Sequence, residues 1–409
     1  MTARQPVFYG WFIVAACFAA TMCIGEVLWS FGVFFDALEA EFSWPRSLVS
    51  SGYTALLLSH GLSAIVAGRL ADRYTARPIM LASALLAGPA IALCSQIHTP
   101  LQFQGFLFLA GLATGAAISV PTSTVQRWFY GRAHAGMALA IVMSGIGVGA
   151  LIFAPLLNHV IASFGWRTGF IVAGAVFFSI LGGAALVMRP SPAERDRSSQ
   201  RSRDGSTDSS RPPIRRLLAT RQFAGVAGIA IIGFSAFQIL LVHLVPYATD
   251  SGISAQTAAV ALGLIGGFSV PGRMLSGFLS ERWGWRRTLA FAILGAAAAL
   301  SSLPLVDQAW TLYCFVALYG LSHGIRAVAL LGMLGHVFGT RSLGELIGVT
   351  IAIAQLCGAM GPYMAGYLFD RWHTYSITFV ALGVLVGLSS LLALRLTTEL
   401  SAHRSDAAA

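Results

Sequence analysis

The sequence predicts an all-α integral membrane protein of twelve transmembrane helices, arranged as two related six-helix halves. Of its 409 residues, 56% are hydrophobic and only 10% are charged, and the mean hydropathy is +0.74. The apolar fraction is higher and the charged fraction lower than in typical water-soluble proteins, so we expect lipid to surround most of the chain. Twelve apolar runs near the roughly 20 residues that a helix needs to cross a bilayer, together with an internal duplication, favour this fold class.

Apolar runs define the expected spans. We expect helices over residues 9–37, 47–70, 77–96, 101–124, 135–160, 167–188, 222–246, 255–280, 287–304, 309–335, 345–369 and 374–396. A stretch rich in Ser, Arg, Asp and Pro separates the sixth span from the seventh, and this composition is typical of a linker. The sequence therefore predicts an N-terminal six-helix half, a linker, a C-terminal six-helix half and a tail, over residues 1–188, 189–221, 222–396 and 397–409.

Arginine sets the expected orientation, because the chain contains no lysine and all 26 basic residues are arginine. Most of them lie in the linker, in the two tails and in connections that fall on the same side of the predicted bundle. The positive-inside rule places that side, and both termini, in the cytoplasm of a multi-pass protein of the cell inner (plasma) membrane. The net charge of +10 is then an orientation signal rather than a nucleic-acid footprint.

The chain repeats a loop motif at an offset of 209 residues. Residues 68–73 (GRLADR) and 277–282 (GFLSER) keep a Gly, a Leu, a small residue, an acid and an Arg in register. The same offset relates Phe129, Arg132, Gly111 and Gly115 to Phe338, Arg341, Gly320 and Gly324. An internal duplication inside a hydrophobic chain is typical of a transporter that is built from two related halves.

With its partner at 277–287, the segment 68–78 resembles the signature of the major facilitator superfamily, and the resemblance extends over essentially the whole chain. It implies the major facilitator fold and transport by alternating access. Charges in the repeated loops are expected to form latches that hold the two halves together on the inner side in one state and break in the other; these are Arg69, Asp72, Arg73, Glu281 and Arg282. The alternative is that these charges only anchor the topology.

Shorter segments resemble the monocarboxylate transporter family and its bacterial relatives, which include oxalate–formate antiporters. They are Tyr9-Gly10-Trp11, residues 30–35, Arg127-Trp128-Phe129, residues 243–253 and Gly272-Arg273. Two positions depart from the family's pattern: Trp29 stands where animal members commonly have a Lys, and Ser269 stands where they have an Asp. The resemblance therefore supports an anion substrate better than it supports the proton pathway of the animal members.

Three side chains that are normally charged lie deep in the predicted spans, namely Glu26, Arg273 and Arg326. An ionised group at the bilayer centre costs roughly 2.5–3.5 kcal/mol or more, so each should face a cavity. The planar guanidinium of Arg273 offers paired donors that suit a carboxylate. The resemblance points to the same residue, because the matching Arg of the family binds substrate. The alternative is an Arg that braces helices by pairing with an acid.

Further candidates for a substrate cavity follow from helical spacing and from polarity. Tyr319, His323 and Arg326 are four and three residues apart, which places them on one face of the tenth span. They either line a cavity, or Arg326 forms a structural ion pair with Glu26. The other candidates are the apolar Leu28 and Trp29, which suit the alkyl end of a small acid, and the polar Thr114, Gln238 and Gln355.

Glu26 is the one acid deep within a span, and it is the candidate for proton coupling. Burial in a low dielectric favours the protonated form of a carboxyl, which suits a proton carrier. A Glu26 that neutralises Arg326 would instead stay ionised and carry no proton. Both alternatives stay open at this point.

The expected function is proton-coupled symport of a monocarboxylate such as lactate or pyruvate. The alternatives are exchange of organic anions, as in oxalate–formate antiporters, and drug/proton antiport. The expected partners are a small organic anion, a proton and the lipid bilayer, but neither nucleic acid nor ATP, and the protein is expected to act as a monomer. We expect no enzyme activity, cofactor or metal, because a chain without Lys has no P-loop and this one contains no metal-binding His pair.

Overall fold

The computed structural model describes residues 8–29, 34, 37–38, 41–44, 46–191, 214–340, 342–358, 360–372 and 374–396. In these ranges the regular secondary structure is helical, with no strand. The chain divides into two compact units, Met1–Arg211 and Pro212–Ala409.

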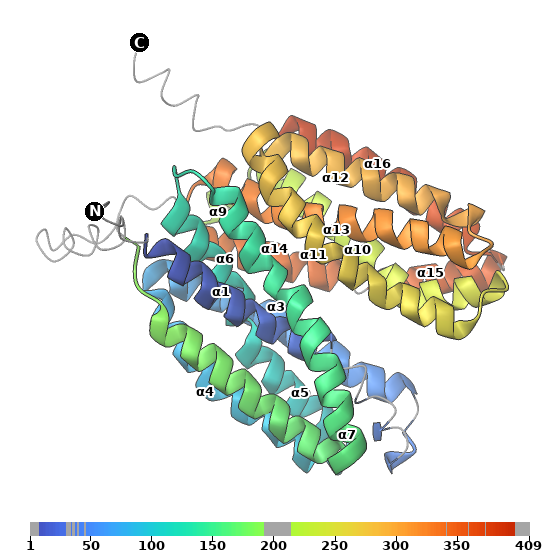
Figure 1. Cartoon of the computed structure of the whole chain (residues 1–409), viewed down its shortest axis with the longest axis horizontal. Helices are drawn as coiled ribbons and strands as arrows, with labels where there is room; N and C mark the ends of the chain where they lie inside the picture. The colour runs from blue at the N-terminus through green and yellow to red at the C-terminus, as the bar shows by residue number, and fades with distance from the viewer. Residues whose placement is uncertain are drawn as a thin grey trace, which may run out of the picture. The chain divides into compact units, whose positions relative to one another are not determined.

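The first unit is a bundle whose long helices are connected by short turns (Figure 1). Its elements are α1 (Gly10–Ile24), the π-helical turn η1 (Gly25–Trp29), α3 (Arg46–Arg73), α4 (Ala76–Leu93), the 3-10 turn η2 (Cys94–Gln96), α5 (Pro100–Thr114), α6 (Ala116–Phe129) and α7 (Ala135–Val187). The 53-residue α7 breaks at Gly165, whose φ of 82° lies in the region that favours glycine. The chain reverses there, so α7 supplies two consecutive spans.

The second unit has a similar architecture (Figure 1). Its elements are α9 (Ile214–Leu218), α10 (Arg221–Asp250), α11 (Ala255–Trp283), α12 (Trp285–Ser302), the 3-10 turn η3 (Leu303–Leu305), α13 (Ala309–Phe338), α14 (Leu343–Gly358), α15 (Met360–Trp372) and α16 (Ser376–Arg395). Large apolar side chains such as Phe291, Val384 and Leu388 are about half exposed, which is the pattern of a bundle solvated by lipid.

The predicted fold class is confirmed. Eleven helical stretches of the described residues are long and apolar enough to cross a bilayer, and one of them is the broken α7, which accounts for two of the twelve expected spans. The first expected span begins with α1 at Gly10 and includes η1 as far as Trp29, and Phe34 and Ala37 near its expected end are also helical. The other residues of its final part lie outside the described residues.

The duplication is visible in the packing inside each unit. Helix α3 packs on α5 in the first unit as α11 packs on α13 in the second. A Cβ on Gly115 would lie 2.7 Å from the carbonyl oxygen of His60, and a Cβ on Gly324 would collide with the carbonyl oxygen of Ser269 and lie 3.0 Å from the amide nitrogen of Arg273. Since 324 and 269 are each 209 residues after 115 and 60, the same close helix contact is built twice.

A polar clasp joins the connection after the first span to the break in α7. The carboxylate of Glu41 accepts hydrogen bonds from Trp166 Nε1 and from Arg167 Nη1, each at 2.6 Å. The Arg167 guanidinium also lies 4.2 Å from the centroid of the Trp166 ring. The hydrogen bond from Trp166, followed by that from Arg167, lowers the pKa of Glu41 below its ordinary value.

Acidification tests this clasp. Because the folded-state pKa of Glu41 is lowered, its carboxylate stabilises the clasp at pH values above the ordinary carboxyl value of about 4.3, and the contribution is lost as the pH falls through the folded-state pKa. We expect the fluorescence of Trp166 to stay constant between about pH 5 and 8 and to change only below about pH 4. The measurement is the difference in emission between the wild-type protein and Trp166→Phe. A transition near neutral pH that persists in Glu41→Gln would contradict the assignment.

The contact at Gly324 is tested by adding one methyl group. Gly324→Ala should push α13 away from α11 and lower the free energy of unfolding by about 1–3 kcal/mol, because the new Cβ meets backbone rather than a flexible side chain. Gly263→Ala is the matched control in α11, since a Cβ there would meet nothing within 4 Å. Thermal unfolding in detergent compares the two variants. Equal stability of both would show that the contact is not tight.

Candidate functional site

Three predicted site residues of α13 lie in the interior of the second unit. Tyr319, His323 and Arg326 are all buried. The Arg326 guanidinium donates a hydrogen bond to the carbonyl oxygen of Gly233 on α10 at 3.3 Å, and the same Nη2 lies 3.4 Å from His323 Nδ1. A guanidinium can only donate, so His323 Nδ1 is the acceptor and the ring proton belongs on Nε2.

Small and aromatic residues of α10 shape the surroundings of Arg326. A Cβ on Gly233 would lie 2.6 Å from Arg326 Cζ, so only a glycine leaves room for the guanidinium at this position. The ring of His323 stacks on Phe237 with centroids 4.3 Å apart, and Tyr319 stacks on the same imidazole at 6.1 Å. The histidine is therefore held between two aromatic rings beside a cation.

Arg273 of α11 belongs to the same region. Its side chain is 3% exposed, and the glycine contact at Gly324 holds its backbone against α13. The positive charges of Arg326 and Arg273 both act on His323, so both guanidinium groups lie near this imidazole. In the described part of the chain, Arg326 hydrogen-bonds to a carbonyl and a neutral imidazole and to no carboxylate. The second unit thus presents two buried cations, and Arg326 is not neutralised within it.

The two predicted glutamines lie on helices that pack on each other, α10 and α14. Gln238 is half-buried, and Gln355 is buried with no hydrogen-bond partner for its Oε1 among the described residues. Within those residues, neither amide hydrogen-bonds to Arg273 or Arg326, so their place at a substrate stays a prediction.

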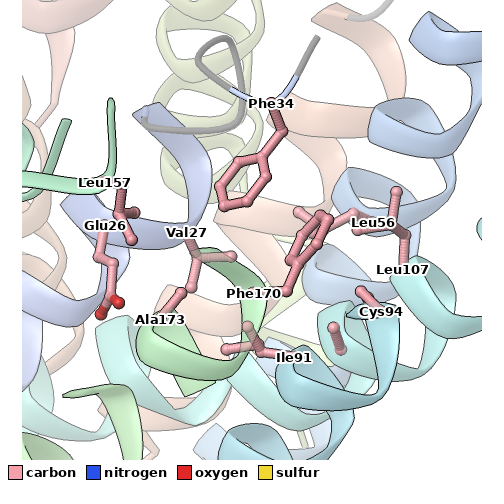
Figure 2. Close-up of a pocket in the computed structure, with 11 residues that line it drawn as sticks. Glu26, Val27, Phe34, Leu56, Ile91, Cys94, Leu107, Leu157, Phe170 and Ala173 are labelled. Atoms are coloured by element: carbon pink, nitrogen blue, oxygen red, sulfur yellow. The ribbon is translucent and has the colours of Figure 1, made fainter. Parts of the chain in front are cut away.

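Glu26 occupies the π-helical turn η1 of the first unit, a type of turn that is frequent at functional sites. It is 2% exposed, and neither carboxylate oxygen has a hydrogen-bond partner among the described residues. Figure 2 shows its side chain beside Leu157 and Ala173 at one edge of a pocket, with the rings of Phe34 and Phe170 on another side. The remaining lining is also apolar and consists of Val27, Leu56, Ile91, Cys94, Leu107 and Ala110.

Other predicted residues of the first unit differ in their surroundings. Leu28 is half-buried, and its carbonyl oxygen accepts a hydrogen bond of 2.9 Å from Tyr53. The hydroxyl of Thr114 donates to the carbonyl oxygen of Gly111 at 3.1 Å and lies 3.1 Å from His60 Nδ1. The side chain of Trp29 is outside the part of the chain that the structure describes.

The Asp72 carboxylate forms an ion pair with Arg127 of α6, which also donates a hydrogen bond of 3.0 Å to the carbonyl oxygen of Ala71. Both partners lie in the first unit, so this pair joins α3 to α6 within one half. Sequence reasoning missed this role of Arg127, although the residue opens one of the segments that carry the family resemblance. The other latch residues are exposed, namely Arg69, Arg73, Glu281 and Arg282, and a latch between the halves stays a prediction.

Two of the family-like segments, residues 9–11 and 127–129, pack on each other at the expected cytoplasmic end of the first unit. Trp11 lies edge-on to Phe129 with ring centroids 5.2 Å apart, and Tyr9 packs on Trp128 at 5.8 Å. The start of α1 is thereby fixed to the end of α6.

Comparison with known proteins gives the family. The family model described as Major Facilitator Superfamily matches residues 12–362. The chain is 26% identical to human Monocarboxylate transporter 11 over 403 residues. This alignment covers 92% of this chain and 81% of that protein. It is 25% identical over 397 residues to the uncharacterized MFS-type transporter YcxA of Bacillus subtilis, with 94% of each chain covered.

Solved structures of major facilitator proteins share the fold. The proton:xylose symporter XylE bound to 6-bromo-6-deoxy-D-glucose superposes with a TM-score of 0.72 at 13% identity, over 96% of each chain. FucP in the outward conformation gives 0.73 at 15% identity, over 94% of this chain and 98% of that one. Taken with the family match over most of the sequence, the apolar helices and the duplicated loop motif, these findings show that the chain is a multi-pass membrane transporter, not an enzyme, and belongs to the major facilitator superfamily.

Proposed function

We propose that this transporter carries a small monocarboxylate, such as lactate or pyruvate, together with a proton, by alternating access. The observation that carries the proposal is the pair of buried arginines, Arg273 and Arg326, that lie near His323. Relatives of about 25% identity that are named monocarboxylate transporters support the same substrate class.

The arginine pair suits an anion for two physical reasons. A buried cation is costly unless an opposite charge compensates it, and the partners of Arg326 in the described part of the chain are a carbonyl and an imidazole. A guanidinium also offers several N–H donors in one plane, which match the two oxygens of a carboxylate. A carboxylate substrate would provide the charge and the acceptors that the second unit lacks around Arg326. We place Tyr319, Gln238 and Gln355 among the residues that would line its site.

Glu26 is the proposed proton carrier. An ionised carboxylate without hydrogen bonds would be costly in its apolar pocket, whereas the protonated acid is tolerated there. A carboxylate that crosses the membrane with one proton moves no net charge, so the membrane potential does no net work on the transported pair. Leu28, Trp29 and Thr114 of the first unit are proposed to form the wall of the substrate path.

Exchange of organic anions is the second candidate, because Arg273 and Arg326 together could hold a dianion.

We further propose that both termini and the linker lie in the cytoplasm, that the protein resides in the plasma membrane, and that it functions as a monomer. The distribution of arginine supports the orientation. The Asp72–Arg127 pair would then lie at the inner surface, with the repeated charges that are proposed to act as latches.

Substitutions of Arg273 test the substrate site. Arg273→Lys keeps the charge but loses the planar fork, so the KM for lactate should rise at least about tenfold, which corresponds to about 1.4 kcal/mol. Arg273→Ala should abolish saturable uptake. The measurement is uptake of labelled lactate, pyruvate, oxalate and formate into proteoliposomes, with and without a pH gradient. Arg371→Ala, an exposed arginine of α15, is the matched control and should transport normally.

The same assay separates the candidate functions. Stimulation of uptake by an acidic outside supports symport, whereas stimulation by an anion loaded inside supports exchange. Near-normal transport of lactate and oxalate by Arg273→Ala would refute the site.

A substitution of Glu26 distinguishes a protonated acid that carries the proton from an ionised acid that pairs with Arg326. Glu26→Gln mimics the permanently protonated acid, so uptake driven by a pH gradient should collapse while counterflow between two loaded sides should survive, because exchange never requires the proton to leave. If Glu26 neutralises Arg326, the variant strands a buried cation, which costs about 3–5 kcal/mol, and both transport modes should fall with the stability. Rescue by the double variant Glu26→Gln, Arg326→Gln would then refute the proton carrier.

A further inference from the structure

The helix layer that holds the candidate anion site in the second unit has a counterpart in the first. At the offset of 209, His323 corresponds to Thr114 and Ser269 corresponds to His60. The packing agrees with this correspondence, because Gly324 touches the carbonyl of Ser269 as Gly115 touches that of His60. Each unit therefore carries one histidine in the equivalent layer, on α13 in the second unit and on α3 in the first.

The hydrogen bonds of His60 define which of its nitrogens holds the proton. Thr114 uses its hydroxyl hydrogen to donate to the carbonyl oxygen of Gly111, so its oxygen accepts from His60 Nδ1 at 3.1 Å. The neutral ring then has a lone pair on Nε2. His60 is 1% exposed, and Nε2 is buried with no hydrogen-bond partner in the described ranges. Burial of an imidazole nitrogen whose lone pair accepts no hydrogen bond costs free energy. Such a nitrogen in a folded protein therefore indicates a functional role.

His60 lies one helical turn from the pocket that contains Glu26. Leu56 of α3 and Ala110 of α5 line that pocket, and His60 and Thr114 follow them by four residues on the same helix faces. The α3 residues that contact Gly115 follow, along the chain, those that contact Gly111. Helices α3 and α5 therefore run in the same direction. Side chains tilt toward the start of their helix, which turns His60 and Thr114 toward the pocket. The His60–Thr114 pair therefore forms the next layer on the expected cytoplasmic side.

Glu26 is the acid among the residues that line this pocket, and Figure 2 shows it across the pocket from Leu56. Helix α3 packs against α5, α6 and α4, and the Leu28 carbonyl of η1 accepts a bond from its Tyr53. Helix α5 carries no titratable side chain. The other charged or titratable groups of the packed elements lie toward helix ends, and they are Arg46, Tyr53, Arg69, Asp72 and Arg73 on α3, Arg77 on α4 and Arg127 on α6.

We propose that His60 is a second proton-accepting group of this transporter, which takes the proton that Glu26 carries and passes it toward the cytoplasm. In this step the O–H bond of the Glu26 acid breaks and an N–H bond forms at His60 Nε2, through water admitted to the pocket. The products are a Glu26 carboxylate and a His60 imidazolium. The imidazolium then releases the proton to cytoplasmic water, which restores the lone pair. The inference rests on the proposed proton coupling at Glu26.

The variant His60→Asn separates proton transfer from structure. The Asn amide can keep the hydrogen bond to Thr114 from the position of Nδ1, but it offers no base in place of Nε2. We expect lactate uptake driven by a pH gradient to fall at least tenfold in proteoliposomes, while lactate counterflow stays within twofold of wild type. His159→Asn, the same change at an exposed histidine of α7, is the matched control and should retain the gradient-driven uptake. A His60→Asn protein with the wild-type uptake and pH profile would overturn the proposal.

A measurement without transport distinguishes failure of this inference from failure of the proposed function. In wild-type protein with ¹⁵N-labelled histidine, we expect a signal that His60→Asn lacks and that changes from neutral to protonated on acidification. Its midpoint should move in Glu26→Gln, since the imidazolium would lose its neighbouring carboxylate. A His60 signal that does not titrate between about pH 4 and 9 refutes the inference whatever the substrate. A titrating signal in a protein that transports no lactate refutes only the proposed substrate.

Discussion

The candidate site depends on one backbone contact, the close approach of α13 to α11 at Gly324. Lipid is as apolar as the helices themselves, so small residues and short-range packing hold helices together in a membrane. Gly324 brings its helix against the carbonyl of Ser269 and the amide of Arg273. A larger residue would move Arg273 away from the face of α13 that carries His323 and Arg326. The spacing between Arg273 and the candidate residues of α13 therefore depends on the glycine next to His323.

The cost of buried charge explains how the rest of the second unit is arranged. Arg326 would strand its guanidinium in an apolar bundle, and the structure reduces this cost with a carbonyl acceptor and an imidazole nitrogen. Both acceptors are neutral, so the hydrogen bonds are satisfied in part while the charge persists. Gly233 contributes the acceptor and the space at once, because any side chain there would occupy the volume of the guanidinium. An anion that enters this region would meet cations that the protein has already positioned.

Local patterns predicted most of the fold and one face of the site. Apolar runs marked the spans, and the spacing of four and three residues placed Tyr319, His323 and Arg326 on one face of α13. Contacts between distant segments were out of reach of spacing arguments, as the Asp72–Arg127 pair shows.

His60 was also missed by the sequence reasoning, because a single histidine in an apolar run is usually a packed core residue. The offset of 209 that relates it to Ser269 was the signal that could have found it.

The two units differ in the charges that lie deep within their helices. At the offset of 209, Arg273 and Arg326 correspond to Ala64 and Ala117, whereas Glu26 corresponds to Ser235. Each unit is thus charged at positions where its counterpart is neutral, although the glycines that set the helix spacing are kept in both. Under the proposed function, this division of charges would let one unit hold the anion and the other hold the proton, so substitutions in one unit would alter binding without altering the fold that supports coupling in the other.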